Sequence, residues 1–239
     1  MKPIIYVGYE AKQDVAYEVL AFSLRKHSST DLDIRPLRLD HLATTIGFDR
    51  PRDPLQSTEF TYTRFLVPYL CHFQGRALFM DCDMLCLGDI NDIYNLDLST
   101  SWLRVVKQSQ QVTRTTKMDG QAQTSYPRKN WSSLMLMNCA SLTCWSLDAV
   151  RTQTGRWLHR FDPIPDPYLG EIPAEWNELD RYDDRTRMIH YTEGGPWLPE
   201  CRDHQYGDIW FAAHAQWQDA LALAAPAATR DQAYVDAPR

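Results

Sequence analysis

Residues Leu78–Leu85 have the sequence LFMDCDML, in which an apolar run ends abruptly in two carboxylates. Arg76–Met80 is predicted to be a buried strand. In an open α/β sheet, ligands bind beyond the carboxyl ends of the strands, which is where Asp81 and Asp83 would lie. Neighbouring carboxylates repel each other unless a cation or hydrogen-bond donors offset the repulsion. The pair therefore predicts a site for a hard divalent cation that also holds substrate phosphates. A strand-ending turn, with Asp83 capping Gly88–Asn95, explains the same pattern.

The residues before this stretch predict a βαβ unit. Ile4–Tyr9 is a short apolar run of the kind that forms a buried parallel strand. Apolar residues then recur at helical spacing from Val15 to Leu24, behind Asp14 as the expected N-cap. Leu32–Leu37 resembles a second strand. A strand, a helix and a strand in this order imply a parallel sheet with a right-handed crossover.

The rest of the chain continues the alternation of strands and helices. Asp40–Leu55 contains a glycine and prolines, and it is predicted to be a loop. Thr58–Leu70 is predicted to be one helix that bends or breaks at Pro68, because proline lacks a backbone N–H. Further strands are expected over Leu103–Lys107, Leu134–Met137 and Arg187–Tyr191, helices over Leu142–Val150 and Asp208–Leu223, an irregular stretch over Ile172–Leu179 and a polar excursion over Ser109–Arg128.

This alternation predicts an α/β fold with a mostly parallel central sheet and helices on both faces. No internal repeat or linker divides the sequence, so a single domain is expected over residues 1–223. The Ala- and Pro-rich residues 224–239 are expected to form a disordered tail.

Composition and charge narrow the class of protein. The chain has 239 residues, of which 44% are hydrophobic and 23% charged, as in an ordinary globular protein. A net charge of −6 argues against nucleic acid as a partner, because phosphate binding favours a basic face. No apolar run approaches the roughly 20 residues that span a bilayer, and no signal peptide precedes the first strand. The six cysteines lack a C-x-x-C pair and are expected to be thiols, so a cytoplasmic protein is predicted.

A second motif lies late in the chain, where Arg187–Trp197 has the sequence RMIHYTEGGPW. A short predicted strand ends in His190, and the turn at Gly194 and Gly195 would let backbone N–H groups approach a ligand. Imidazole beside carboxylates modestly favours Mn²⁺ over Mg²⁺, which prefers oxygen. A core histidine followed by an ordinary turn is the alternative interpretation.

Taken in order, these motifs resemble glycosyltransferase family 8, which includes glycogenin and bacterial lipooligosaccharide galactosyltransferases. The sequence YTRF at 62–65 precedes the two aspartates, WSSLMLMN follows at 131–138, and the segment from His190 to Trp197 comes last. The resemblance runs from Met1 to about residue 210 in widely spaced motifs. Asp-x-Asp is weakly specific alone, whereas the ordered set is much more specific.

The resemblance implies a GT-A fold and a metal-dependent glycosyltransferase that retains the configuration of the transferred sugar. The donor would be a nucleotide-diphosphate sugar, with a UDP-sugar favoured, and the acceptor a glycan or glycolipid. Mn²⁺ (or Mg²⁺) would be held by Asp81, Asp83 and His190. The inner face of the membrane is one location within the cytoplasm that the resemblance allows.

Residues for the donor also follow from the resemblance. Those expected to bind the nucleotide sugar are Tyr6, Val7, Gly8 and Tyr9 at the end of the first strand, Arg64 near the base or ribose, Asp81, Ser132 and Ser133 near the sugar, and Gly194 and Gly195 in the late turn.

The sequence departs from the family's pattern at two places. The family has a lysine before its Pro-Trp pair, where this chain has Gly195 and is one residue shorter. Arg128, Lys129 or Arg202 would have to contact the phosphates in its stead. In addition, no Asp-Gln pair matches the family's acceptor-side motif before Asp180.

Two residues are predicted to be catalytic. Breaking the sugar–phosphate bond makes the sugar oxocarbenium-like, so a carboxylate or an amide on its face would help. Glu171 is the first candidate for this group, and Asn177 is the second residue assigned to catalysis. A solvated loop acid is the alternative interpretation of Glu171.

Other functions remain open at this stage. A degenerate transferase fold could serve as a nucleotide- or glycan-binding module, although the presence of both acids and His190 argues against it. Aspartyl-phosphate phosphatases also place Asp-x-Asp after a strand, but they usually have Thr or Val where this chain has Leu85.

Overall fold

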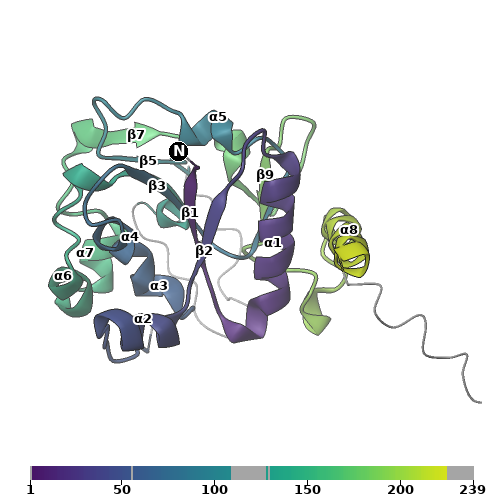
Figure 1. The fold of residues 1–239 in the computed structure, drawn as a ribbon, viewed down its shortest axis with the longest axis horizontal. Helices are drawn as coiled ribbons and strands as arrows, with labels where there is room; N and C mark the ends of the chain where they lie inside the picture. Colours follow the sequence, from purple (N-terminus) through teal and green to yellow (C-terminus); the bar gives the residue numbers. More distant parts are fainter. Residues whose placement is uncertain (1, 55, 109–127, 129, 225–239) are drawn as a thin grey trace, which may run out of the picture.

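Two β-sheets organise the chain (Figure 1), and the computed structural model describes residues 2–54, 56–108, 128 and 130–224. The larger sheet has the strand order β2-β1-β3-β6-β5-β7, and the smaller one has the order β4-β9-β8. The strands are β1 (Ile4–Gly8), β2 (Asp33–Leu37), β3 (Arg76–Met80), β4 (Met84–Cys86), β5 (Leu103–Val105), β6 (Leu134–Asn138), β7 (Leu169–Glu171), β8 (Glu178–Leu179) and β9 (Met188–His190). The α-helices are α1 (Asp14–His27), α2 (Leu39–Ile46), α3 (Phe60–Thr63), α4 (Val67–Leu70), α5 (Asn91–Tyr94), α6 (Leu147–Thr152), α7 (Gly155–His159) and α8 (Gly207–Ala224).

The larger sheet is mixed and mostly parallel, as predicted. β1 pairs in parallel with β2 and β3, and β5 pairs in parallel with β7. Only β6 runs antiparallel, between β3 and β5. The carboxyl ends of the five parallel strands therefore share one side of the sheet, which we call the carboxyl edge. Asp81 follows β3 at this edge.

The turn after β3 carries the chain from the larger sheet into the smaller one. The Asp81 N–H donates to the Ser133 carbonyl at 3.0 Å, which ties the start of the turn to the segment before β6. β4 begins directly after Asp83 and pairs antiparallel with β9, with Met84 opposite His190. This pairing brings a distant strand end next to the two acids. β4 is absent from the prediction because three residues are too few to show a period.

Helices cover both faces of the larger sheet, as predicted. In Figure 1, α1 lies on one side of β1 and β2 with α8 beyond it, and α3, α4, α6 and α7 lie on the other side. α1 buries Ala16, Leu20 and Leu24 at the four-residue spacing of one helical face. None of the helices in the described residues is long and apolar enough to cross a membrane.

A second hydrophobic cluster fixes the smaller sheet. Val19 of α1, Leu85 of β4, Ile189 of β9, Tyr191 and Trp210 of α8 form it, and none of them is more than 2% exposed. Burying a large apolar side chain contributes about 1.5–3 kcal/mol. The cluster therefore holds β4, β9 and α8 together against α1.

The prediction of a loop over Asp40–Leu55 is wrong at its start, which belongs to α2. Leu42 lies in the core, and the helix ends at Gly47, whose φ of 63° is in the left-handed region that glycine adopts most easily. The prolines that favoured a loop lie beyond this end.

The prediction of one helix over Thr58–Leu70 is also wrong, because a 3₁₀ turn over Arg64–Leu66 separates α3 from α4. Pro68 lies in the first turn of α4. Its missing N–H removes the hydrogen bond to the Arg64 carbonyl that a continuous helix would make. The break expected at Pro68 is present, displaced by one turn.

The helix expected over Leu142–Val150 begins later, at Leu147. Ser146 caps it, because the Ser146 hydroxyl accepts a hydrogen bond from the Ala149 N–H at 3.1 Å. In the sequence, the start of this helix is indicated by Ser146, a serine within an apolar run.

Two further predictions are corrected. α1 begins at Asp14 after a 3₁₀ turn, and the Asp14 carboxylate accepts a hydrogen bond from the Tyr9 hydroxyl at 2.6 Å instead of capping the helix. The stretch Ile172–Leu179, expected to be irregular, contains a 3₁₀ turn and the strand β8, which pairs with β9.

The excursion over residues 109–127 and the tail over residues 225–239 lie outside the described residues. The single domain over residues 1–223 stays a prediction.

Candidate metal centre

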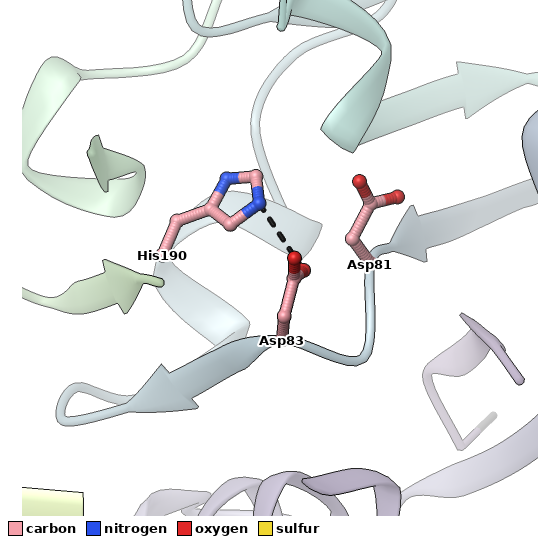
Figure 2. A group of neighbouring side chains, drawn as sticks. All are labelled: Asp81, Asp83 and His190. Carbon is pink, nitrogen blue, oxygen red and sulfur yellow. Dashed lines mark ion pairs between the residues drawn. The ribbon is translucent and has the colours of Figure 1, made fainter. Parts of the chain in front are cut away.

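Asp81, Asp83 and His190 meet at the carboxyl edge. Each offers a ligand atom, and these atoms all lie within 4.8 Å of one another. Figure 2 shows the His190 ring facing the Asp83 carboxylate, with Asp81 on the same turn. The two atoms that face each other are His190 Nε2 and Asp83 Oδ1, 3.1 Å apart. The prediction that a strand-ending acid pair and a far-off imidazole share one location is confirmed.

The charges of this cluster are strongly coupled. Burial opposes ionisation of Asp83, but the facing His190 outweighs burial and lowers the Asp83 pKa. Burial likewise opposes protonation of His190, yet Asp83 and then Asp81 raise the His190 pKa above its ordinary value. Asp83 and His190 therefore stabilise each other's charged forms. Two carboxylates and an imidazole are a donor set that suits Mn²⁺. Mg²⁺ fits the same set less well, because it prefers oxygen ligands to nitrogen.

Arg64 forms a buried ion pair with Asp81. Its Nη1 lies 2.9 Å from Asp81 Oδ1 and also donates to the Ser132 carbonyl at 2.8 Å, while its Nε donates to the Phe60 carbonyl at 3.2 Å. The Arg64 side chain is only 7% exposed. Its observed partner is thus a carboxylate of the centre, and the predicted contact with the base or ribose stays a prediction.

Asn177 contacts the His190 ring at Nδ1, the nitrogen that faces away from Asp83. The amide Nδ2 donates to the Ser133 hydroxyl at 2.9 Å, and His190 Nδ1 lies 2.9 Å from Asn177 Oδ1. The Ser133 hydroxyl in turn donates to the Asn130 carbonyl at 2.6 Å. Gln108 Nε2 donates to the Asn177 carbonyl at 2.6 Å. Asn177 and Ser133 therefore contact a metal-ligand candidate and the backbone around it, and their predicted contacts with the sugar are untested.

The residues at the end of β1 differ in what they can offer a nucleotide. Tyr6 is buried, and its hydroxyl accepts from Arg35 Nη1 at 3.1 Å. Val7 is fully buried in the sheet, where it lies opposite Pro36 and Met80. Gly8 allows the Phe60 ring to pack against the strand, because a Cβ there would lie 2.4 Å from the ring. The nucleotide-binding role of these residues stays a prediction.

The predicted sugar-side residues Glu171 and Ser132 lie at the same edge. Glu171 ends β7, and its side chain is exposed. The buried Ser132 hydroxyl lies 2.9 Å from His159 Nδ1. The catalytic role of Glu171 stays a prediction.

In the turn at Gly194 and Gly195, the Trp197 ring packs against the backbone. A Cβ on Gly195 would lie 1.9 Å from the Trp197 indole, so the ring covers the position where the family has lysine. Gly194 has a φ of 109°, which strains any other residue. Position 195 therefore offers no side chain to a ligand, and the predicted role of Gly194 and Gly195 in donor binding stays a prediction.

Two of the proposed substitutes for that lysine are engaged elsewhere. Arg128 pairs with Asp166 and with the carbonyl of Arg160, and the Arg202 guanidinium lies 5.6 Å from the centre of the Phe211 ring. Lys129 lies outside the described residues.

Sequence reasoning missed a clasp on the segment after β9. Asp180 follows β8, and its carboxylate accepts from the Thr192 hydroxyl, from the Glu193 N–H at 3.3 Å and from His204 Nε2 at 3.2 Å. The Tyr206 N–H donates to His204 Nδ1 at 3.2 Å, so Nε2 carries the proton. No sequence pattern announces this pairing, because its partners are spread over the chain.

Sequence reasoning also missed Glu10, which is 2% exposed beside β1. Its carboxylate accepts from the Glu59 N–H at 2.6 Å and from Gln13 Nε2 at 3.0 Å. It thereby joins the start of α3 to the end of β1. Glu10 could have been identified from its position directly after a buried strand, which is the pattern that identified Asp81.

Comparisons with known proteins agree with this fold. A sequence profile described as Glycosyl transferase family 8 matches residues 18–157. Protein CDI of Arabidopsis thaliana is 40% identical over 216 residues, which cover 86% of this chain and 83% of that protein.

Two solved structures share the fold at 14% identity. One is the galactosyltransferase LgtC in complex with donor and acceptor sugar analogs, with a TM-score of 0.55 over 89% of this chain and 95% of that chain. The other is the apo structure of the bifunctional glycosyltransferase WbbM, with a TM-score of 0.62 over 93% of this chain and 51% of that chain. The chain thus spans about half the length of WbbM. The predicted resemblance to GT-A folds is confirmed.

Proposed function

Because this chain belongs to glycosyl transferase family 8, we propose that it is an active, metal-dependent hexosyltransferase. The donor is a nucleotide-diphosphate sugar, with UDP-sugars favoured, and the acceptor is a glycan or glycolipid. The observation that carries this proposal is the convergence of Asp81, Asp83 and His190 at the carboxyl edge.

Each residue of the centre has a distinct part in the proposed chemistry. A bound Mn²⁺ or Mg²⁺ would stabilise the negative charge that develops on the leaving diphosphate. Asp83 and His190 hold the ligand atoms that face each other, and Arg64 holds the Asp81 carboxylate in place through its buried ion pair. A rigid, partly dehydrated donor set of this kind supports metal binding without reorganisation.

The sugar side of the reaction is assigned to Glu171. The transferred sugar becomes oxocarbenium-like as its bond to phosphate breaks, and a carboxylate near its face stabilises that charge. The exposed side chain of Glu171 at the end of β7 lies on the same edge of the sheet as the acids. Retention of configuration at the transferred sugar belongs to the same proposal and rests on family membership.

The experiment is a screen of nucleotide sugars for Mn²⁺-dependent release of nucleoside diphosphate. The wild-type protein is expected to hydrolyse one donor slowly without acceptor and to stop when EDTA is added. Asp83→Ala should lose this activity by at least about 100-fold, because the remaining two ligands hold a divalent ion poorly. Asp31→Ala is the matched control, since Asp31 is an exposed carboxylate paired with Lys2.

Two results would contradict the proposal. Unchanged activity of Asp83→Ala would remove the metal centre from the reaction. A wild-type protein that binds uridine diphosphate in calorimetry but cleaves none of the donors would favour the binding-module alternative.

A further inference from the structure

We propose that Ser133 and Asn177 fix the tautomer of His190, so that Nδ1 carries the proton and Nε2 keeps its lone pair for the metal. This role rests on the metal centre of the proposed function. It makes Ser133 and Asn177 positioning residues, and it assigns them no contact with the sugar.

The proposal follows from a chain of hydrogen bonds in which the donor and the acceptor of every bond are fixed by the bond before it. The Asn130 carbonyl can only accept, so the Ser133 hydroxyl gives its single proton to that carbonyl, 2.6 Å away. Ser133 Oγ can then only accept from Asn177, and the Asn177 amide nitrogen must face it. Asn177 Oδ1 is consequently turned towards His190 and accepts the proton on Nδ1 at 2.9 Å.

The opposite tautomer would disable the centre. With the proton on Nε2, His190 would donate to Asp83 Oδ1, which lies 3.1 Å away, and would have no lone pair on the side of the two acids. A metal ligand needs the neutral ring with a free nitrogen, and the hydrogen bond at the other ring nitrogen decides which nitrogen that is.

Burial makes this control effective. Asn177 is 1% exposed, Ser133 2% and His190 3%, so water has little access to replace any member of the chain. The backbone of Asn177 is held as well, by the N–H bond to the Ala174 carbonyl at 3.0 Å and by Gln108 Nε2 on its own carbonyl. The amide can neither turn over nor move away without breaking several hydrogen bonds.

The test compares substitutions that differ in what they offer Nδ1. Asn177→Leu removes the acceptor, and Ser133→Ala frees the amide to turn its NH₂ group towards His190. Asn177→Asp keeps an acceptor at the same place. Ser23→Ala is the control, because Ser23 is equally buried and bonded to the Leu20 carbonyl and the Cys86 N–H away from the acids.

Two readouts are needed, and neither is enzymatic activity. The first is the affinity for Mn²⁺ alone, measured by electron paramagnetic resonance of the free ion. The second is the ¹⁵N NMR signature of the His190 tautomer in metal-free protein, at a pH high enough for a neutral ring. Asn177→Leu and Ser133→Ala should weaken Mn²⁺ binding about 10–100-fold and show a proton on Nε2. Asn177→Asp and Ser23→Ala should keep the Nδ1 proton and the affinity of the wild type.

The outcomes separate this role from the metal centre itself. If the wild type binds Mn²⁺ and Asn177→Leu and Ser133→Ala bind it equally well, the positioning role is overturned while the proposed function stands. If the wild type shows the proton on Nε2, the direction of the chain is wrong. If the wild type binds no Mn²⁺, the metal centre fails, and this role fails with it.

Discussion

At the scale of single residues, Asp81 and Asp83 have similar neighbours in sequence and different partners in space. Asp81 faces the permanent charge of Arg64, whereas Asp83 faces His190, whose charge depends on its proton. Arg64 therefore carries its charge at every pH, whereas the charge that faces Asp83 depends on the protonation of His190.

Cys71 provides a test of the electrostatics away from the centre. A hydrogen bond with the Cys139 thiol outweighs burial and lowers the pKa of Cys71 to about 7, and the Tyr6 hydroxyl lies 4.0 Å from its sulfur. Because the thiolate is the nucleophile, alkylation of Cys71 by iodoacetamide should accelerate as pH rises from about 6 to 8 and then level off. Mass spectrometry of timed digests measures this rate.

Cys86 is the internal control for that measurement. Burial raises the pKa of Cys86 to about 12, so it should stay unmodified in the folded protein over the same pH range. Equal rates at the two cysteines, or a Cys71 rate that still rises steeply above about pH 9, would contradict the assignment.

The sequence pattern placed Asp81 and Asp83 after one apolar strand and His190 at the end of another, and the resemblance to family 8 implied that the three share a metal. It was insufficient for Asn177, whose contact with His190 depends on the pairing of β8 with β9. The ion pair between Arg64 and Asp81 could not be predicted for a similar reason. Arg64 lies in a 3₁₀ turn, and no periodicity in the sequence indicates that turn.

At the scale of elements, strands and helices with a clear apolar run were predictable, the three-residue β5 and β9 included, whereas β4, β7 and β8 were not. β1, β3 and α8 carry enough apolar residues to show their type. β4, β7 and β8 have two or three residues each, so their conformation comes from the partner strands and not from local preference. These short elements build the smaller sheet and the edge of the larger one, where the site lies. The same short elements are therefore the ones that position the functional side chains.

The segment after β9 is fastened by the Asp180 clasp, which gives a prediction at this scale. Asp180→Ala removes the acceptor for Thr192, the Glu193 N–H and His204 together. Because Asp180 ties three separate points of this segment to β8, residues 191–206 should exchange their amide protons faster without it, while β1 and β3 keep their protection. Hydrogen–deuterium exchange with mass spectrometry measures both.

Asp184→Ala is the matched control for the clasp, because Asp184 is an exposed acid between β8 and β9. Its exchange pattern should equal that of the wild type. If Asp180→Ala leaves exchange over 191–206 unchanged, the turn around Gly195 is held by the packing of Trp197 instead.

At the scale of the whole molecule, α8 packs against the body through the buried Gly207 and Trp210, with the partly buried Ile209, Phe211, Ala213 and Trp217 beside them. Trp210 is 2% exposed, and its ring lies 5.3 Å from that of Trp197 and 5.1 Å from that of His214. Most of the remaining described helix is partly or fully exposed. Trp210 is thus the one large side chain of α8 that is buried in the core.

Trp210→Ala is expected to lower the free energy of unfolding by about 3–5 kcal/mol, the range for removing a buried large aromatic residue. Urea denaturation followed by circular dichroism measures the change. Leu223→Ala is the control, because Leu223 is 88% exposed on the same helix and should change stability by less than about 0.5 kcal/mol. Equal effects of the two substitutions would mean that α8 does not contribute to the core.

The two acids sit on the short link between the sheets, and His190 belongs to the smaller sheet alone. A newly made polypeptide therefore cannot present all three donors until β9, one of the last strands to emerge, has paired with β4. An ion captured at this centre would arrive late in biosynthesis, and only in a molecule whose halves have already assembled. Loading with metal would then mark completed molecules, and partly folded ones would remain unloaded and inactive towards the donor.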